Sequence, residues 1–245
     1  MSNRKPKGFQ CKQFFVAHDQ CAMKVSTDSL ILGSFVSPAK ATRILDIGTG
    51  SGILALMLAQ KMVPEAHIEA IDIDQSAVIQ ALENVRLSPW PENITVSHCA
   101  LQSLSGAGVY DLIVSNPPYF ADANGQTKAY DTMADARGIA RTEQTLSVAR
   151  FFAETARLSN DSGKLYCMYP WLRHEEVLAV AAHHGWHCVA RMQVQHRCDV
   201  APYLVIYEFS REAGQCSDSQ LIIRAEDNQY TPKYKALCQE FYLNF

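Results

Sequence analysis

The chain is 245 residues long, with 48% hydrophobic and 19% charged residues and a formal net charge of −3. These values suit one large α/β core of a globular enzyme, or one core plus a small appendage, and exclude a chain that relies on an overall positive field to bind nucleic acid. The sequence has neither an apolar stretch near the roughly 20 residues that span a bilayer nor a secretory signal, so we expect a cytoplasmic protein that binds no membrane.

Eight cysteines are scattered along the chain without a C-x-x-C pair. In a cytoplasmic protein we expect them to be reduced, and most lie in apolar surroundings that predict core positions. Cys188 and Cys198 lie near His187 and His196, but their spacing matches no closed set of zinc ligands. We therefore expect no metal.

In chain order, the hydrophobic pattern first predicts a short amphipathic helix over 27–36, with Thr27 or Asp28 as its N-cap. Short β-branched runs then alternate with helical stretches. The expected strands are 42–47, 67–73, 94–99, 110–115 and 163–169, followed by 188–194 and 202–209. The expected helices are 53–62, 75–87, 142–158 and 175–184. Beyond them we expect turns at Gly214 and Pro232, a short strand near 221–224 and an aromatic tail.

The alternation of strand and helix predicts the fold class. Right-handed β-α-β crossovers place such strands in a mostly parallel sheet with helices on both faces. A short polar turn joins the last two runs, so these two strands should pair antiparallel. The sequence therefore predicts a single-domain, α/β, Rossmann-like fold whose seven-stranded, mostly parallel sheet ends in an antiparallel hairpin.

A glycine-rich turn follows the first expected strand of the sheet, in the run Asp46-Ile-Gly48-Thr-Gly50-Ser-Gly52. Glycines let the backbone pass close to a ligand, and the helix beyond offers unpaired N–H groups to a carboxylate or a phosphate. Asp72 ends the next strand, 24 residues after Gly48, where a carboxylate can accept both ribose hydroxyls of a nucleoside. The glycines have the spacing G-x-G-x-G, and Asp46 stands two residues before the first of them. This pattern favours S-adenosylmethionine over a dinucleotide, because the carboxylate attracts an ammonium and repels a pyrophosphate.

The string Asn116-Pro117-Pro118-Tyr119 follows the fourth strand, at the carboxyl edge where doubly wound sheets bind ligands. Conjugated amines are poor nucleophiles because their lone pair is delocalised. The Asn116 side-chain oxygen and the Pro117 carbonyl can accept both N–H groups of such an amine and turn its lone pair toward a methyl donor, while Tyr119 stacks on the flat substrate. With these three residues as the catalytic group, the string predicts methyl transfer to a planar nitrogen, and the N6 amine of adenine in RNA is the leading candidate.

Both motifs resemble those of class I N-methyltransferases that carry N-P-P-[YFW], and blocks near both ends and after the second motif narrow the likeness. These blocks are Phe9-Gln-Cys-Lys12-Gln-Phe14, Cys21-Ala-Met-Lys24-Val-Ser-Thr27-Asp28-Ser-Leu-Ile-Leu32-Gly33, Asp135-Ala-Arg137-Gly-Ile-Ala-Arg141, Tyr230-Thr-Pro-Lys-Tyr234 and Phe241-Tyr242-Leu243. In these blocks the chain is similar to bacterial tRNA1(Val) adenine-N6 methyltransferases. The resemblance extends over essentially the whole chain.

The resemblance implies S-adenosylmethionine as cofactor and, as substrate, the adenosine at position 37, immediately 3′ of the anticodon, in tRNA1(Val). We expect residues 1–40 to form a cap segment that packs on the cofactor site of a methyltransferase domain, 41–245, and we expect a monomer. Lys24, Thr27 and Asp28 are implied near the methionine end of the cofactor or the mouth of the pocket. The residues expected to bind the cofactor are Lys24, Thr27, Asp28, Asp46, Gly48, Gly50, Gly52, Asp72 and Asn116.

One position departs from the pattern of the class. Its members usually place an acid after the third strand to take the adenine amine of the cofactor, and Ala100 occupies that place here. Backbone groups or Gln102 are therefore expected to read the cofactor adenine.

Two regions are candidates for RNA binding. Arg4 and several lysines precede the first acid of the chain, and the loop 120–138 is long for a strand-to-helix connection. An anticodon-loop base is already unpaired, so extruding it costs less than opening a duplex. The protein loop 120–138 is expected to close over the RNA backbone. The residues expected to bind RNA are Lys5, Lys7, Lys12, Lys128, Arg137 and Arg141.

Three other functions remain open from the residues alone. A glutamine-amide N5-methyltransferase of a release factor uses the same chemistry on another planar nitrogen, but we expect it to carry a helical N-terminal domain, and only about 40 residues precede the first strand here. A guanine-N2 methyltransferase of ribosomal RNA is the second. The third is an RNA chaperone that binds S-adenosylmethionine without turnover, which Asn116 and Tyr119 argue against.

Overall fold

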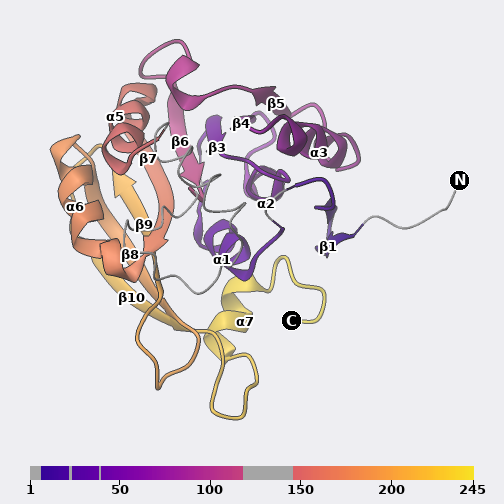
Figure 1. Ribbon diagram of the computed structural model, residues 1–245, viewed down its shortest axis with the longest axis vertical. Helices are drawn as coiled ribbons and strands as arrows, with labels where there is room; N and C mark the ends of the chain where they lie inside the picture. Colours follow the sequence, from indigo (N-terminus) through magenta and orange to yellow (C-terminus); the bar gives the residue numbers. More distant parts are fainter. Residues whose placement is uncertain (1–6, 22–23, 39, 118–145) are drawn as a thin grey trace, which may run out of the picture.

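The computed structural model describes residues 7–21, 24–38, 40–117 and 146–245. These residues form one eight-stranded sheet with helices on both faces, together with a separate two-stranded hairpin near the N-terminus (Figure 1). None of the helices in these ranges is long and apolar enough to cross a bilayer.

The sheet has the strand order β10-β8-β9-β7-β6-β3-β4-β5. Its strands are β3 (Arg43–Ile47), β4 (His67–Asp72), β5 (Ile94–His98), β6 (Tyr110–Ser115), β7 (Ser159–Pro170), β8 (His187–Gln195), β9 (Leu204–Ser210) and β10 (Ser217–Ile222). β9 runs antiparallel to both neighbours, and every other pair in the sheet is parallel. The predicted α/β, Rossmann-like architecture is confirmed. The antiparallel pairing predicted for strands 188–194 and 202–209 is confirmed as well.

The two faces of the sheet carry separate apolar cores because side chains alternate along each strand. On β3, for example, Ile44 packs in one core and Leu45 in the other. The first core is covered by α1 (Thr27–Phe35), α2 (Ile53–Lys61), α3 (Gln75–Arg86) and α7 (Pro232–Cys238). The second is covered by α5 (Val148–Leu158) and α6 (His174–His183). Figure 1 shows these two groups of helices on opposite sides of the strands.

The predicted count of seven strands is wrong, because β10 adds an eighth strand outside the hairpin. β10 pairs in parallel with β8, so the hairpin is not the edge of the sheet. Its sequence, Ser-Asp-Ser-Gln-Leu-Ile, has four polar residues that are exposed and carry little strand propensity. Only its apolar end resembles a strand, and the prediction near 221–224 therefore begins four residues too late.

Two predicted helix starts also differ from the structure. Ser26, not Thr27 or Asp28, is the N-cap of α1, and its hydroxyl accepts a hydrogen bond from the Ser29 N–H. The helix expected over 142–158 begins at Val148 in the structure. Ser147 is its N-cap, because the Ser147 hydroxyl accepts the Arg150 N–H. Residues 142–145 lie outside the described part of the chain.

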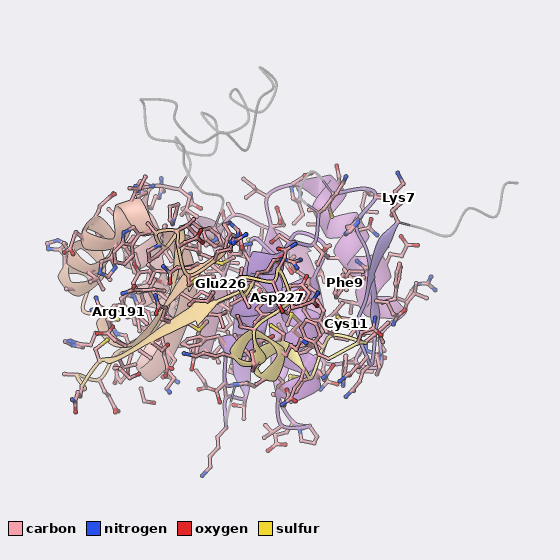
Figure 2. The ribbon with its side chains drawn as sticks, turned by 90° about the horizontal axis from the view of Figure 1, so that it is seen from below. Lys7, Phe9, Cys11, Arg191, Glu226 and Asp227 are labelled. Atoms are coloured by element: carbon pink, nitrogen blue, oxygen red, sulfur yellow. The ribbon has the colours of Figure 1, made fainter. Side chains whose placement is uncertain are left out.

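The N-terminal hairpin packs against the C-terminal tail. It consists of β1 (Gly8–Gln10) and β2 (Phe15–Ala17). Cys11 forms a β-bridge with Tyr242, and the Phe9 ring meets the Tyr242 ring edge-on with centroids 5.5 Å apart. Figure 2, the molecule seen from below, shows Phe9 and Cys11 toward one end, Glu226 and Asp227 near the middle and Arg191 toward the other end. No local pattern predicts this pairing, because each strand has only three residues.

Candidate active site

The two predicted motifs meet at the carboxyl edge of the sheet. In the β3–β6 pairing Ile47 lies opposite Ser115, so the glycine turn and Asn116 leave the sheet side by side. In the β3–β4 pairing Ile47 lies opposite Ile71, which places Asp72 next to the start of the same turn. The Ser115 hydroxyl donates to the Ile47 carbonyl at 2.9 Å and ties the two strand ends together.

The glycine turn adopts a conformation that glycine alone accepts easily. Gly48, Gly50 and Gly52 have φ values of 68°, 56° and 82°. A Cβ added at Gly48 or Gly50 would meet no atom of the described chain within 4 Å, so the space above the turn is open. The Gly48 and Thr49 N–H groups both donate to the Ile71 carbonyl, at 2.9 and 3.0 Å. The turn is therefore a fixed, open cradle between β3 and α2 that fits a ligand lying on backbone.

Asp46 is fully buried under this cradle. Its Oδ2 accepts hydrogen bonds from the Thr49 hydroxyl at 2.6 Å and from the Ala55 N–H at 3.2 Å. Its Oδ1 is buried and has no hydrogen-bond partner among the described residues. Burial raises the pKa of the Asp46 carboxyl to about 7, against its two hydrogen bonds, which favour the charged form. A cation such as the methionine ammonium of S-adenosylmethionine fits this orphaned oxygen.

Asp72 holds the other side of the cradle. Its Oδ2 accepts from the Gly50 N–H at 2.8 Å and its Oδ1 from the Asp74 N–H at 2.9 Å. A carboxylate has about four lone-pair sites, so the side chain can still accept from a ligand hydroxyl. Burial raises the pKa of Asp72, and the backbone hydrogen bonds oppose that shift.

Asn116 follows β6 with its two amide atoms in different surroundings. Its Nδ2 donates to the Ser29 hydroxyl at 3.1 Å, and its Oδ1 is buried without a partner among the described residues. Pro117 is buried beside it, and Tyr119 lies outside the described residues. Asn116 Oδ1 is therefore in the state that the catalytic hypothesis requires of the atom that accepts the N–H of the substrate amine.

The N-terminus of α1 reaches this site, and the three residues predicted there have different surroundings. Asp28 is half-buried, and its Oδ1 accepts the Tyr203 hydroxyl at 2.6 Å. His196 stacks on the other side of Tyr203 with ring centroids 4.0 Å apart. Thr27 and Lys24 are exposed. Burial raises the pKa of Asp28, and the Tyr203 hydrogen bond opposes that shift.

The place predicted for reading the cofactor adenine lies beyond β5. Ala100 is the residue before a short 3-10 helix, η1 (Leu101–Ser103), which contains Gln102. Ile73, directly after Asp72, is 53% exposed and offers an apolar surface next to the carboxylate predicted to bind the ribose. The sequence motifs did not include this residue. The signal in the sequence was an apolar residue directly after the acid that ends the strand.

Polar residues on α3 hold the N-terminal segment against the cradle, and these too were missed. Asn84 is 2% exposed; its Oδ1 accepts the Ala17 N–H at 2.9 Å, and its Nδ2 donates to the carbonyls of Ala17 and Ser51 at 2.8 Å each. Gln80, also buried, accepts the Gln20 N–H at 3.0 Å. The signal was two amides four residues apart on the inward face of a predicted helix.

The predicted RNA-binding residues are not gathered into one patch in the described part of the chain. Lys7 is exposed beside β1 (Figure 2). The Lys12 ammonium instead donates to the main-chain carbonyl of Gln239 at 2.5 Å and contacts that of Phe245 at 3.4 Å. Lys5, Lys128, Arg137, Arg141 and the loop 120–138 lie outside the described residues.

The residues considered for zinc have other surroundings. The Cys188 thiol lies 3.5 Å from that of Cys216, and His196 stacks on Tyr203. Within the described ranges no three His, Cys, Asp or Glu side chains are grouped to hold a metal ion.

The similarity of this chain to known proteins agrees with the geometry of the site. Residues 20–146 match the family model of the methyltransferase small domain, which spans both motifs. The sheet and the cradle at its edge are those of a class I, S-adenosylmethionine-dependent methyltransferase.

Relatives over nearly the whole chain narrow the class. A tRNA1(Val) (adenine(37)-N6)-methyltransferase from Tolumonas auensis is 43% identical over 96% of each chain. Proteins of the same name from Cronobacter sakazakii and Salmonella enteritidis are 40% and 41% identical, over 96% of this chain and 95% of theirs. The chain belongs to the tRNA1(Val) (adenine(37)-N6)-methyltransferase family. The resemblance found in the sequence motifs, the enzyme class and the cofactor are thus confirmed.

Solved structures support the fold. A predicted O-methyltransferase from Agrobacterium tumefaciens matches with a TM-score of 0.66 at 15% identity, over 86% of this chain and 95% of its own. A ribosomal protein L11 methylase from Lactobacillus delbrueckii subsp. bulgaricus matches with a TM-score of 0.56 at 20% identity, over 80% and 84%.

Proposed function

We propose that this protein transfers a methyl group from S-adenosylmethionine to the N6 amine of adenosine 37, the nucleotide 3′ of the anticodon, in tRNA1(Val), as the names of its relatives say of them. The observation that carries the proposal is the Asn116 side chain beside the glycine cradle, with a buried Oδ1 that has no partner among the described residues. A buried, unsatisfied acceptor costs about 1–3 kcal/mol, so a substrate donor that pairs with it is strongly favoured.

The substrate amine is activated by hydrogen bonding. Asn116 Oδ1 accepts one N–H of the adenine N6 amine, and the Pro117 carbonyl accepts the other. The two acceptors favour a pyramidal nitrogen, whose lone pair leaves the ring plane. Tyr119, which lies outside the described residues, is proposed to stack on the adenine. Transfer of the methyl group would form the N–C bond as the S–C bond breaks, and would leave a neutral thioether and a cationic nitrogen. That cation is strongly acidic and gives its proton to water, so the site needs no general base.

The cofactor supplies an electrophilic methyl group on a sulfonium. The chain's own residues orient it: Asp46 Oδ1 pairs with the ammonium, and the Asp72 carboxylate accepts the ribose hydroxyls. Gly48 and Gly50 leave room above the backbone between them. The Ile73 side chain offers an apolar surface to the adenine, while backbone groups or Gln102 read its edge. Lys24, Thr27 and Asp28 complete the mouth of the pocket.

We also propose that residues 1–40 cap the cofactor site of the domain formed by 41–245. Two sets of hydrogen bonds and one electrostatic effect support this arrangement. Asn84 joins Ala17 of the segment to Ser51 of the glycine turn, and Gln80 holds Gln20. Cys21 lies close enough to Asp72 for that carboxylate to help raise the pKa of its thiol to about 11, after the larger effect of burial.

RNA is proposed to contact Lys5, Lys7 and Lys12 and, from the loop after the N-P-P-Y string, Lys128, Arg137 and Arg141. Lys12 is the weakest member of this set, since its ammonium already binds two main-chain carbonyls of the tail. We propose that the enzyme acts as a cytoplasmic monomer and selects the valine tRNA.

The proposal is tested by incubating the purified protein with deuterated-methyl S-adenosylmethionine and either total tRNA from a strain lacking the enzyme, ribosomal RNA, or a release factor. Nucleoside mass spectrometry should find labelled N6-methyladenosine in the tRNA and no label in the other two. Label on a glutamine amide of the release factor, or on guanine N2 of the ribosomal RNA, would replace the proposal with one of the rival functions. A protein that binds the cofactor and labels none of the three would be a binding protein without turnover.

A further inference from the structure

The N-terminus of α1 touches the proposed catalytic amide directly. Ser29, 87 positions before Asn116 in the chain, accepts the Asn116 Nδ2–H at 3.1 Å. Ser29 is only 6% exposed, so water does not compete freely for this contact. A side chain from α1 therefore holds a side chain from the loop after β6.

The contact matters because the two ends of an asparagine amide have opposite hydrogen-bonding roles. Its oxygen accepts, its nitrogen donates, and a half-turn about the last side-chain bond exchanges them. In the structure the nitrogen faces Ser29, so Oδ1 is left as the buried, unpartnered atom among the described residues. In the reversed orientation an N–H group would face the N–H groups of a substrate amine, and no hydrogen bond would form.

The helix cap offers the Ser29 hydroxyl an acceptor for its own hydrogen. The Ser26 hydroxyl caps α1 by accepting the Ser29 N–H at 3.2 Å, and the two serine hydroxyls lie 3.1 Å apart. When the Ser29 hydroxyl donates its hydrogen to Ser26, its lone pairs are left for the Asn116 N–H. One chain of hydrogen bonds then runs from the cap of α1 to the amide at the end of β6.

We propose that Ser29 is a positioning residue that fixes the Asn116 amide with Oδ1 turned toward the substrate amine. The inference rests on the proposed function for its effect on rate, and on the hydrogen bond alone for its effect on the amide. Ser29 acts only through Asn116. Removing it should slow methyl transfer without weakening the binding of tRNA or cofactor.

The kinetic test is a double-mutant cycle in single-turnover methylation of tRNA with both ligands saturating. Ser29→Ala should lower the rate on the order of tenfold with unchanged Kd for both ligands, and Asn116→Ala should lower it about a hundredfold. The double variant should be no slower than Asn116→Ala alone. Ser34→Ala, which removes the same hydroxyl from the last turn of α1, is the control and should keep the wild-type rate. A wild-type rate for Ser29→Ala, or reductions that multiply in the double variant, overturns the inference.

A second measurement separates this inference from the proposed function. The side-chain amide of Asn116 is identified in a 15N–1H correlation spectrum as the pair of signals that Asn116→Ala removes. Ser29→Ala should shift these signals toward those of a solvated amide and speed their exchange with water, while Ser34→Ala leaves them unchanged. Unmoved signals in Ser29→Ala contradict the inference whatever the substrate is. Shifted signals in a protein that methylates no tRNA would uphold the positioning role and reject the proposed function.

Discussion

At the scale of single residues, two side chains at the carboxyl edge each keep one buried oxygen without a partner among the described residues, Asp46 Oδ1 and Asn116 Oδ1. Buried polar atoms are nearly always hydrogen-bonded, so such atoms point to ligands that pair with them. The acidic atom suits a cation and the neutral amide oxygen suits an N–H donor. This pairing matches the ammonium of the cofactor and the amine of the substrate.

The charge state of Asp46 should control cofactor binding. Burial raises its pKa to about 7 from an ordinary 3.8, so below pH 7 the folded, cofactor-free protein holds a proton there. The ammonium pairs with the carboxylate, and binding must release that proton. Affinity for S-adenosylmethionine should therefore rise by up to about tenfold per pH unit below the pKa and level off above it. Calorimetric titrations across this range measure the slope.

Asp46→Asn is the matched variant for that slope, since it keeps the shape and removes the titration. Its affinity should be low and nearly independent of pH, and an equal slope in both proteins would assign the titration to another group. The cofactor-free wild type should also become less stable as pH rises from about 4 to about 7, because the folded state binds the proton more tightly than the unfolded state.

Asn116→Ala should reduce turnover far more than binding. The hydrogen bond from the substrate amine strengthens as the nitrogen becomes pyramidal, so it belongs mainly to the transition state. Removing one such preorganised group costs on the order of a hundredfold in rate, about 3 kcal/mol. Single-turnover methylation gives the rate, and separate titrations should find tRNA and cofactor affinities near those of the wild type. A near wild-type rate would make the N-P-P-Y string an ordinary turn.

At the scale of helices and strands, the sequence predicted the elements that carry strong local patterns. β6 was placed with its observed bounds, and β3, β4 and α2 within a residue. Their continuous apolar runs and glycine boundaries are typical of buried strands and helices. Because the motifs follow these elements directly, the sequence also predicted that Asp46, Asp72 and Asn116 meet at one edge.

Some of the missed elements depend on partners that are distant in the chain, and one, α7, had a local signal. β1 and β2 have three residues each, and Cys11 pairs with Tyr242. Pro232, expected in a turn, is the first residue of α7, with the Thr231 hydroxyl capping the Tyr234 N–H at 3.2 Å. The Thr-Pro start of a helix was readable locally. The contact of Ser29 with Asn116 was not, because no local pattern links two polar residues 87 positions apart.

The C-terminal tail that contains Phe241 should contribute substantially to the free energy of unfolding. Phe241 is 1% exposed in the core beneath α1 and α2, and its carbonyl accepts the Lys12 N–H at 3.0 Å. Phe241→Ala should lower the free energy of unfolding by about 3–5 kcal/mol. Leu243→Ala, two residues away and 54% exposed, should change it by less than about 0.5 kcal/mol. Urea unfolding curves measure both, and equal, small decreases would show that the tail is not part of the core.

At the scale of the whole molecule, the net charge of −3 offers no general attraction for RNA. Binding must come from local cations, and affinity that depends on phosphate contacts falls steeply with salt. The proposed cofactor cradle lies at the sheet edge beside α1–α3, and the residues proposed to bind RNA come from the start of the chain and from the sequence after the N-P-P-Y string.

The N-terminal lysines should contribute through charge. Replacing Lys5 and Lys7 with Gln should weaken tRNA binding and reduce the slope of log K against log salt by about 0.7–0.9 for each phosphate that the variant no longer neutralises. Lys40, shortly before β3, and Lys164, in β7 opposite Leu112 of β6 and paired with Glu208, form the double control. If both double variants keep the wild-type slope, the N-terminal lysines bind no phosphate, and the basic residues of 120–138 become the better candidates.

The proposed reaction is tested most sharply by where the methyl group goes. Two full-length tRNA1(Val) transcripts that differ only at position 37, adenosine in one and guanosine in the other, are incubated with the enzyme and labelled cofactor. We expect one methyl group per molecule of the adenosine transcript, recovered as N6-methyladenosine at position 37, and none on the guanosine transcript. Equal labelling of both transcripts, or a methyl group on any other atom or position, would be incompatible with methyl transfer to adenosine 37.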